Sequence, residues 1–403
     1  MNISKKDILE QLRINGRILL NLSNNYKNDA DCILAALSNS GYLLLDLPLK
    51  YRKKREFVLT AVQNYGYILE HTPDFADDKE IVLYAVKNKG NAIRFASEKL
   101  QKDFEVALNA VKQNGLSYAL ISKYFANSKV IIEQAIEQNP LVLRYLNETY
   151  CKDKKLVAKA VVQNGMVLAY ADKSLQQDRD IVNLSVHNNG LAIKYAIGFQ
   201  NDKQIMLKAI QQNALSIQYA PQDWLYDLEF LNSAIEVNPY VLKSCLFFNK
   251  ELVEKAIKKD GLTINFAPEK YKNDFNLALM AVKQNGMALQ YLNSELKANL
   301  DICKVAIRQN GLAIQFSLLD LTKYPQLAQL AILKDARAID LLPKQFKNDP
   351  EFLFLAMRED ISLLSVADNN TLFNITNILI SEFKKRELFD QLEQLLPKNK
   401  FFH

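Results

Sequence analysis

The residue types that most often do chemistry are few and scattered in this 403-residue chain. Its three histidines, His71, His187 and His403, are too far apart in sequence to indicate a metal site or a catalytic triad. The four cysteines are also dispersed and lack the spacing of a zinc site, so we interpret them as small core residues in a reducing compartment. No glycine-rich phosphate loop is present. The sequence therefore predicts no catalytic residue, no metal and no cofactor.

Basic and amide residues nevertheless recur at one place in an internal repeat. Ten of the eleven glycines stand about 25 residues apart or at a multiple of that distance, and we call the glycine of each repeat position zero. Four residues later stand the candidate binding residues Arg94, Arg144, Lys194, Gln218, Lys243, Gln290 and Gln315. The basic ones fall in every second repeat, and the row is neutral after Lys243. On the concave side of a solenoid, cations about 20 Å apart would favour an acidic peptide, protein or phosphorylated ligand.

Two further rows follow the same period. An amide stands two residues before zero, and we interpret it as a partner for backbone groups of the adjacent repeat; the row is Gln113, Gln138, Gln163, Asn188, Gln212, Gln284 and Gln309. A tyrosine or phenylalanine stands five residues after zero, and its helical spacing favours a core position over a ladder that stacks nucleic-acid bases; the row is Phe95, Tyr145, Tyr170, Tyr195, Tyr219, Phe266, Tyr291 and Phe316.

The elements that carry these rows can be predicted from capping signals. Asp349-Pro350-Glu351 is typical of a helix start, with aspartate as the cap and proline at the first helical position, and an acidic or polar residue recurs there in most repeats. An amphipathic run of about ten residues follows. Asn-Gly at zero is then interpreted as the start of a second, short helix, because Pro140 and Pro239 also occupy zero and proline cannot adopt positive φ.

Between one repeat and the next, the sequence predicts a loop that holds one large apolar residue nine or ten after zero. Trp224 is one of these residues, and its register favours packing over a role as a ligand platform. At zero we expect glycine, alanine or proline for their small size, where the long and short helices meet.

No β alternation appears, so the predicted fold is all-α. It is an α-solenoid of about fifteen repeats of ~25 residues, each a long helix followed by a short helix or 3₁₀ helix, in a superhelical rod. Where glycine is missing, zero is taken by Pro140, Ala214, Pro239, Ala336 and Ile361. We expect residues 1–365 to form one continuous solenoid and residues 366–403 a C-terminal helical cap over its last face.

The repeat pattern D-x-x-[IV]-[VL]-x-A-V-x-Q-N-G-x-A-[LI]-x-[YF]-A, seen for example in residues 274–292, resembles an uncharacterised helical repeat family of about fifty residues. The resemblance covers roughly residues 54–350. It implies kinship with large protist proteins and with proteins that intracellular bacterial pathogens deliver into host cells. The family has no defined activity, so the resemblance implies no catalytic residue.

These observations predict a non-enzymatic scaffold that binds a host or bacterial protein with an acidic surface through an extended concave face. The net charge of +6 falls short of the dense basic clusters of nucleic-acid binders. No apolar run reaches the ~18 residues of a membrane span, and the N-terminus lacks a secretory signal. We therefore expect a cytoplasmic protein in the producing cell, and the resemblance adds delivery into a host cytosol. Two alternatives stay open: a helical-repeat RNA-binding protein and a regulator of another effector enzyme.

Overall fold

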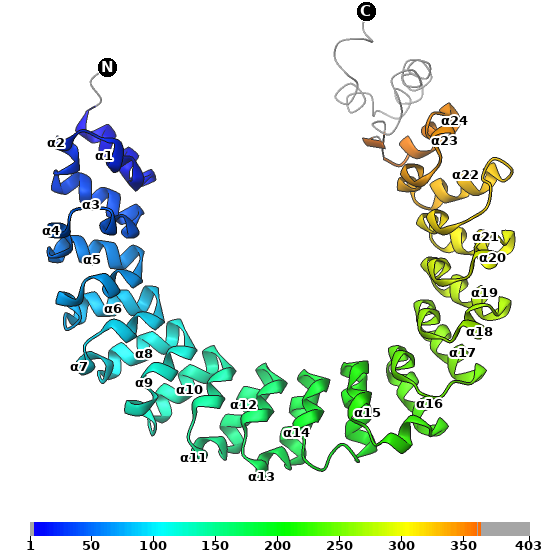
Figure 1. Ribbon diagram of the computed structural model, residues 1–403, viewed down its shortest axis with the longest axis horizontal. Helices are drawn as coiled ribbons and strands as arrows, with labels where there is room; N and C mark the ends of the chain where they lie inside the picture. The colour runs from blue at the N-terminus through cyan, green and yellow to red at the C-terminus, as the bar shows by residue number, and fades with distance from the viewer. Residues whose placement is uncertain (1–3, 361, 364–403) are drawn as a thin grey trace, which may run out of the picture. The chain divides into compact units, whose positions relative to one another are not determined.

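The computed structural model describes residues 4–360, 362 and 363, and all regular structure in that part of the chain is helical. Internal contacts divide the chain into two compact units, residues 1–212 and 213–403, which we call the N-terminal and C-terminal units. Within each unit, successive long helices lie side by side (Figure 1). The chain is thus an α-solenoid, as predicted. The cap expected over residues 366–403 lies outside the described residues, and the extent of the solenoid, 1–365, stays a prediction.

Each repeat begins with a long α-helix. These helices are α1 (Lys5–Ile14), α3 (Ala30–Asn39), α5 (Arg55–Asn64), α6 (Lys79–Asn88), α8 (Phe104–Gln113), α10 (Lys129–Gln138), α12 (Lys154–Gln163), α14 (Arg179–Asn188), α15 (Lys203–Gln212), α16 (Leu228–Val237), α17 (Lys250–Lys259), α19 (Phe275–Gln284), α21 (Leu300–Gln309), α22 (Pro325–Lys334) and α24 (Pro350–Met357).

A 3₁₀ helix then starts at position zero in every repeat whose zero residue is described. These helices are η1 (Gly16–Asn21), η2 (Gly41–Leu45), η3 (Gly66–His71), η5 (Gly90–Phe95), η6 (Gly115–Ser117), η7 (Pro140–Tyr145), η8 (Gly165–Tyr170), η9 (Gly190–Tyr195), η10 (Ala214–Tyr219), η12 (Pro239–Ser244), η13 (Gly261–Phe266), η14 (Gly286–Tyr291), η15 (Gly311–Phe316) and η16 (Ala336–Leu341).

A third helical piece, most often a single turn, precedes the next long helix in most repeats. These pieces are α2 (Asn24–Lys27), α4 (Leu49–Arg52), η4 (Pro73–Phe75), α7 (Glu98–Gln101), α9 (Tyr118–Phe125), α11 (Glu148–Cys151), α13 (Lys173–Gln176), η11 (Gln222–Leu225), α18 (Glu269–Lys272), α20 (Ser294–Lys297) and α23 (Lys344–Lys347). The sequence had predicted a plain loop here, which is wrong.

Four of these helical pieces carry a side-chain N-cap seven residues after zero, and four others are preceded there by a proline; the caps are Ser97, Asn147, Asp172 and Asn293. The side chains of Ser97 and Asn293 accept the backbone N–H groups of Leu100 and Leu296. The large apolar residue of this segment packs against the repeat that follows, as expected. Trp224, for example, stacks at a tilt on the ring of Phe230, with 4.7 Å between the ring centroids.

The interpretation of Asn-Gly as a helix start is confirmed. Among the described glycines only Gly198 has positive φ, at 83°, and it does not occupy position zero. The Asn285 side chain caps η14 by accepting the N–H of Met287 at 3.1 Å. The same cap, from an asparagine or aspartate, recurs in most repeats because it satisfies a donor that the first turn leaves free.

Position zero is small because of the next repeat, and this corrects the expected reason. A Cβ atom on Gly286 would lie 2.3 Å from the carbonyl oxygen of Ala306, which belongs to α21 of the following repeat. The short helix therefore presses its first residue against the neighbouring long helix, and not against the long helix of its own repeat. The buried core lies between these elements, with Leu277 and Ala281 of α19 fully enclosed.

The amide row joins neighbouring repeats, as predicted. The Gln284 side-chain oxygen accepts the Gly261 N–H at 2.6 Å, and its Nε2 donates to the Lys259 carbonyl at 3.2 Å. Asn188 does the same with Gly165, at 2.7 Å, and with Val162. Asn188, Gln212, Gln284 and Gln309 thus satisfy groups at the C-terminal end of the preceding long helix and at the start of the 3₁₀ helix after it. Gln163 is an exception, because the zero residue in its register is Pro140, which has no N–H.

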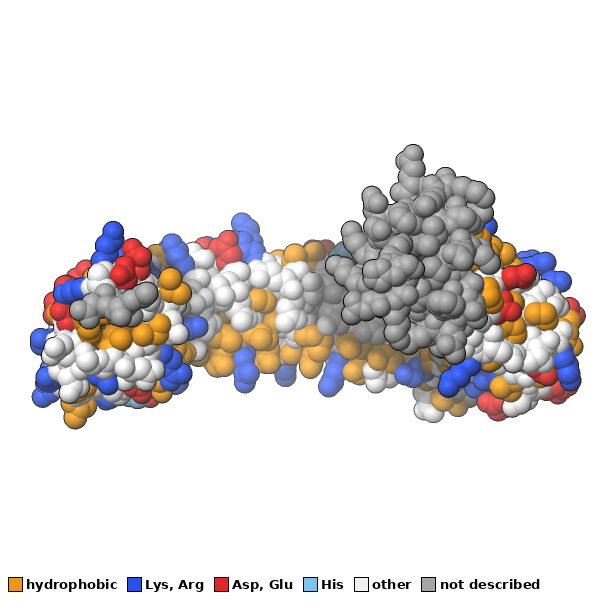
Figure 2. Space-filling view, turned by 90° about the horizontal axis from the view of Figure 1, so that it is seen from above, with side chains coloured by type: hydrophobic (Ala, Val, Ile, Leu, Met, Phe, Trp, Pro, Cys, Tyr) orange, Lys and Arg blue, Asp and Glu red, His pale blue; other side chains and the backbone are white. Residues whose placement is uncertain are grey.

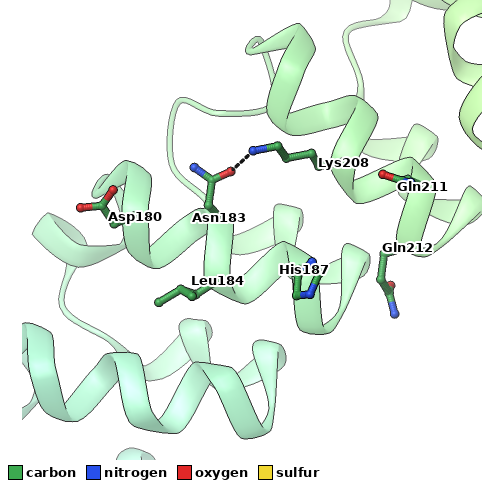
Figure 3. Close-up of a pocket in the computed structure, with 7 residues that line it drawn as sticks. All are labelled: Asp180, Asn183, Leu184, His187, Lys208, Gln211 and Gln212. Carbon is green, nitrogen blue, oxygen red and sulfur yellow. Dashed lines mark hydrogen bonds between the residues drawn. The ribbon is translucent and has the colours of Figure 1, made fainter.

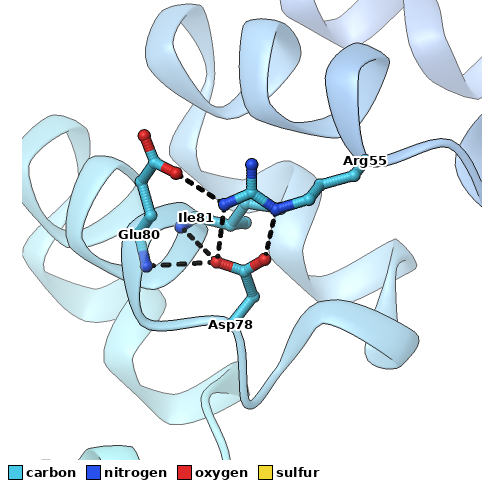
Figure 4. Close-up of polar contacts among 4 residues, drawn as sticks. All are labelled: Arg55, Asp78, Glu80 and Ile81. Carbon is cyan, nitrogen blue, oxygen red and sulfur yellow. Dashed lines mark hydrogen bonds and ion pairs between the residues drawn. The ribbon is translucent and has the colours of Figure 1, made fainter.

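Ion pairs join the opposite ends of the long helices. Arg55, the first residue of α5, contacts Asp78 at 2.7 Å and Glu80, both at the start of α6 (Figure 4). Asp78 also caps its own helix through the N–H groups of Glu80 and Ile81. Equivalent pairs in the N-terminal unit are Lys5–Asp29, Lys79–Asp103, Lys154–Asp178 and Arg179–Asp202, and Lys250–Asp274 is one in the C-terminal unit. The two ladders fix the register of adjacent helices at both ends.

Candidate binding surface on the 3₁₀ helices

The seven candidate residues all occupy the fifth position of a 3₁₀ helix. The N-terminal unit contributes Arg94 from η5, Arg144 from η7 and Lys194 from η9. The C-terminal unit contributes Gln218, Lys243, Gln290 and Gln315 from η10, η12, η14 and η15. The two residues before each candidate are buried, so the candidate side chain faces outward. Six of the seven are exposed, and Gln290 is half-buried.

The aromatic row lies beside the candidate row and is not core, contrary to the prediction. Tyr145 and Tyr170 are 41% and 38% exposed, and the remaining rings of the row are half-buried. The space between the helices is already filled by smaller residues, as Ala92, Ile93 and Ala96 show in η5 and the residue after it. Each ring therefore covers the rim of its repeat with one face towards solvent.

Cations lie over these rings. The Arg144 guanidinium is 5.2 Å from the ring centre of Tyr145 and 5.8 Å from that of Tyr170 in the next repeat. Lys194 lies 5.5 Å from the ring centre of Tyr195. Such contacts contribute about 0.5–1 kcal/mol at exposed sites. We call Arg94, Phe95, Arg144, Tyr145, Tyr170, Lys194 and Tyr195 the cation–aromatic row of the N-terminal unit.

The position directly after zero adds apolar area to the same face, and the sequence reasoning missed it. Leu141 is 37% exposed. The Tyr67 ring meets Phe95 of the next repeat at 6.3 Å between centroids. The sequence shows where this residue stands in each repeat. Whether its side chain is exposed depends on how the next repeat covers the 3₁₀ helix. In the space-filling view, basic and hydrophobic side chains stand beside one another on the surface (Figure 2).

The C-terminal unit repeats the pattern with weaker charge. Lys243 lies 6.0 Å from the Phe266 ring centre, and Tyr240 contacts the same ring. The Tyr240 hydroxyl donates to the Asp260 carboxylate at 2.7 Å, and this bond raises the pKa of Tyr240 to about 12. Gln290 and Gln315 donate to carbonyls of their own 3₁₀ helices, at 3.1 and 3.0 Å. These two amides therefore satisfy their own helices. Gln218 and the basic members of the row are exposed.

A second kind of surface feature lies between adjacent long helices. A hollow of about 690 Å³ between α14 and α15 is lined by Asn183, Leu184, His187 and Lys208 among others (Figure 3). Lys208 donates to Asn183 across it, at 2.9 Å. A similar hollow lies between α10 and α12. His187 is exposed there, and His71 is exposed elsewhere in the same unit; His403 lies outside the described residues.

The described residues contain no candidate metal cluster, and their cysteines are unpaired. No three histidine, cysteine, aspartate or glutamate side chains among them are placed to hold a metal ion. All four cysteines are free thiols, and burial raises the pKa of Cys245 to about 11, which keeps that thiol protonated. In the part of the chain that the structure covers, no helix is long and apolar enough to cross a membrane.

Fold and surface together define an α-solenoid repeat protein. Repeated matches to one family model, described as a domain of unknown function (DUF4116), cover well over half of the chain, and the chain belongs to this family. The matched segments are residues 54–101, 78–126, 103–151, 153–197, 202–246, 249–297 and 274–321. Each matched segment is 45 to 49 residues long and so spans two of the repeats described above; some successive segments overlap by about one repeat, such as 54–101 and 78–126, and others do not overlap. No curated protein and no solved structure matches the chain significantly.

Proposed function

We propose that this protein is a non-enzymatic interaction scaffold. It binds an acidic, extended segment of a partner protein along the cation–aromatic row of the N-terminal unit. The observation that carries the proposal is the arrangement of Arg144 over Tyr145 and Tyr170. Exposed arginine and tyrosine side chains held together are the residue types that contribute most at protein interfaces.

The charge of this row is available to a ligand. Arg94, Arg144 and Lys194 form no ion pair with any described residue, whereas Arg55, Lys79, Lys154 and Arg179 at the starts of long helices are paired with acids of the next repeat. A carboxylate of the partner would gain a charge-assisted hydrogen bond without displacing an internal partner. Apolar side chains between the partner's acidic residues would rest on the half-exposed rings.

Charge reversal of the row tests the proposal. The variant Arg94→Glu/Arg144→Glu/Lys194→Glu is compared with Lys87→Glu/Lys112→Glu/Lys155→Glu, which changes the net charge equally but alters exposed lysines of the long helices. The probe is a set of fluorescent extended peptides graded from neutral to acidic, read by anisotropy. We expect affinity to rise with acidity and to fall about tenfold or more only in the first variant. Equal effects of both variants, or no preference for acidic peptides, would refute the proposal.

RNA binding is a second candidate, and one observation favours it. The aromatic rings, expected in the core, are half-exposed beside cations, and such rings can stack on bases of single-stranded RNA. The modest net charge argues for the protein partner instead. A gel shift with single-stranded RNA at low and moderate salt separates the two. Tight binding that the row variant abolishes would replace the protein-binding proposal with the RNA one.

The cellular location of the protein is part of the same proposal. The resemblance to repeats of proteins delivered by intracellular bacteria supports a partner in a host cytosol, where the chain would act as a scaffold or as a regulator of another effector enzyme. A translocation reporter fused to the chain in such a bacterium tests delivery. Absence of the reporter signal from host cells would remove delivery and leave the binding proposal to its own test.

A further inference from the structure

Asn-Gly is also a chemically reactive pair, and the repeat places it many times in the chain. The backbone nitrogen of the glycine can attack the asparagine Cγ, and glycine has no side chain to hinder the attack. Asn-Gly pairs stand at the start of 3₁₀ helices at residues 15–16, 114–115, 164–165, 189–190, 285–286 and 310–311. The structure shows how far each pair is restrained from reacting.

Two hydrogen bonds restrain the pair in most repeats. The Asn285 side-chain oxygen is held by the N–H of Met287, and the Gly286 N–H is held by the Gln309 side chain of the next repeat. Asn285 has ψ 110°, which turns the glycine nitrogen away from Cβ, so ring closure needs the cap to rotate. Reaction at such a site therefore requires local opening of both bonds.

Asn310-Gly311 lacks one of these restraints. Asn310 caps Leu312 at 3.0 Å and has ψ 114°, as its counterparts do. Two residues before zero in the next repeat, however, stands Lys334 in place of glutamine or asparagine, and a lysine ammonium cannot accept an N–H. Lys334 lies against Gly311, with its Cβ 3.1 Å from where a Cβ of that glycine would be. No described residue accepts the Gly311 N–H.

We infer that Asn310 is the preferred site of spontaneous deamidation among the Asn-Gly pairs of the C-terminal unit. The Gly311 nitrogen loses its proton and bonds to Cγ of Asn310, and the bond from Cγ to the side-chain nitrogen breaks. The side-chain nitrogen leaves as ammonia, with its own two protons and the one that the Gly311 nitrogen lost. Water then opens the five-membered imide at either carbonyl and gives aspartate or isoaspartate. No oxidant or metal is required.

The two products affect the repeat differently. Aspartate can keep the cap, because Asp260 and Asp335 already occupy the equivalent position and cap their 3₁₀ helices. Isoaspartate adds a methylene to the backbone between α21 and η15, beside Gly311, where even an added Cβ atom would lie only 2.3 Å from the Ala331 carbonyl oxygen of the next long helix. Asn310 is therefore a position where age alone can change the contact between two repeats.

Peptide mapping by mass spectrometry tests the inference on the full chain, incubated at mildly alkaline pH. One hydrogen bond changes a local opening equilibrium by about two- to tenfold, so Asn310 should lose ammonia faster than Asn285 by that factor. Lys334→Gln restores the missing acceptor and should slow Asn310 by a similar factor. Gln309→Ala removes the acceptor for Gly286 and should accelerate Asn285.

The control variants are analysed by the same peptide mapping. Lys304→Gln removes an exposed lysine elsewhere on α21 and should leave both rates unchanged, and circular dichroism verifies that each variant is folded. Equal rates at Asn310 and Asn285 in the wild type, or an unchanged Asn310 rate in a folded Lys334→Gln variant, would overturn the inference.

Discussion

The side-chain oxygen of Gln284 accepts the backbone N–H of Gly261, 23 residues earlier in the chain, at 2.6 Å. The same side chain donates to the Lys259 carbonyl, so one amide satisfies two backbone groups of the preceding repeat. Gln284 is itself exposed, whereas Gly261 is buried. The contact therefore supplies a partner to a buried donor from a residue at the surface.

Replacing Gln284 by alanine should destabilise the C-terminal unit. The buried Gly261 N–H loses its acceptor, and an unsatisfied buried donor costs about 1–3 kcal/mol. Urea unfolding followed by the fluorescence of Trp224, the only tryptophan of the chain, measures the effect. Gln218→Ala is the matched control, because Gln218 is exposed in the candidate row and should change stability by less than about 0.5 kcal/mol. Equal losses in the two variants would contradict this account.

A methyl group at position zero should be poorly tolerated in the glycine repeats. Gly286→Ala drives a Cβ to within 2.3 Å of a backbone oxygen, and we expect a loss of about 3 kcal/mol from overpacking. Gly198→Ala meets no neighbouring atom, and its cost of about 1–2 kcal/mol comes only from positive φ. Asparagine tolerates positive φ better than alanine, so Gly198→Asn should recover part of that loss while Gly286→Asn should not. Thermal unfolding of the four variants distinguishes a loss of stability caused by steric overlap from one caused by backbone strain.

Acid should weaken the ion-pair ladder. Arg55 and Lys154 hold the pKa values of Asp78 and Asp178 below the ordinary value of an aspartate. A carboxyl whose pKa is lowered by folding contributes its full stability above the unfolded value, near 4, and loses it as pH falls through the folded value. The melting temperature should therefore drop below about pH 4. Asp78→Asn/Asp178→Asn, which can keep the helix caps, should show a smaller drop than the wild type. An identical drop would assign the acid sensitivity to other groups.

At Pro239 and Lys259 the chain replaces a glycine and an amide of the amide row. The effects of these two residues on stability should be coupled. Proline has no N–H to donate, and the residue that would accept it is here a lysine, which pairs with Glu236 instead. Pro239→Gly alone creates an unpartnered N–H, and Lys259→Gln supplies its acceptor. A double-mutant cycle should give a favourable coupling of about 0.5–1.5 kcal/mol. The same cycle with Lys258→Gln should give none; coupling there would point to a general effect of charge.

Much of the fold follows from the sequence because the repeat is marked at its capping positions. Asn-Gly and Asn-Pro identified the start of the short helix in eight repeats, and the period supplied the others; proline excluded the alternative with positive φ. The third helical turn was missed although its caps, such as Ser97 and Asn293, recur seven residues after zero. A small polar residue or a proline seven after zero, as at Ser97, Asn147, Pro221 and Pro268, was the signal that could have found it.

The candidate surface was less predictable. Arg144 and Lys194 are exposed, and their role in binding stays a prediction. The prediction that Tyr170 lies in the core was wrong. Helical spacing identifies which face of a helix a residue occupies, but not how much of that face the next repeat covers. The ion-pair ladder could have been read from the sequence, since Lys79 and Asp103 are 24 residues apart and recur with the repeat.

The hydrogen bonds of the amide row and the ion pairs between long helices join adjacent repeats only. The number of repeats can therefore change while the remaining repeats keep this kind of contact. Removing residues 91–140 would join Gly90 to Leu141 and excise two whole repeats. Gln163 would then take the place of Gln113 as acceptor of the Gly90 N–H, and Asp153 that of Asp103 beside Lys79, whereas Lys155 would replace Glu105. Because basic residues stand in every second repeat, such an excision would also preserve their alternation. Gain or loss of repeats in pairs would change the length of the surface while leaving the spacing of its charges the same, and under the proposed function this would change the length of the bound partner segment.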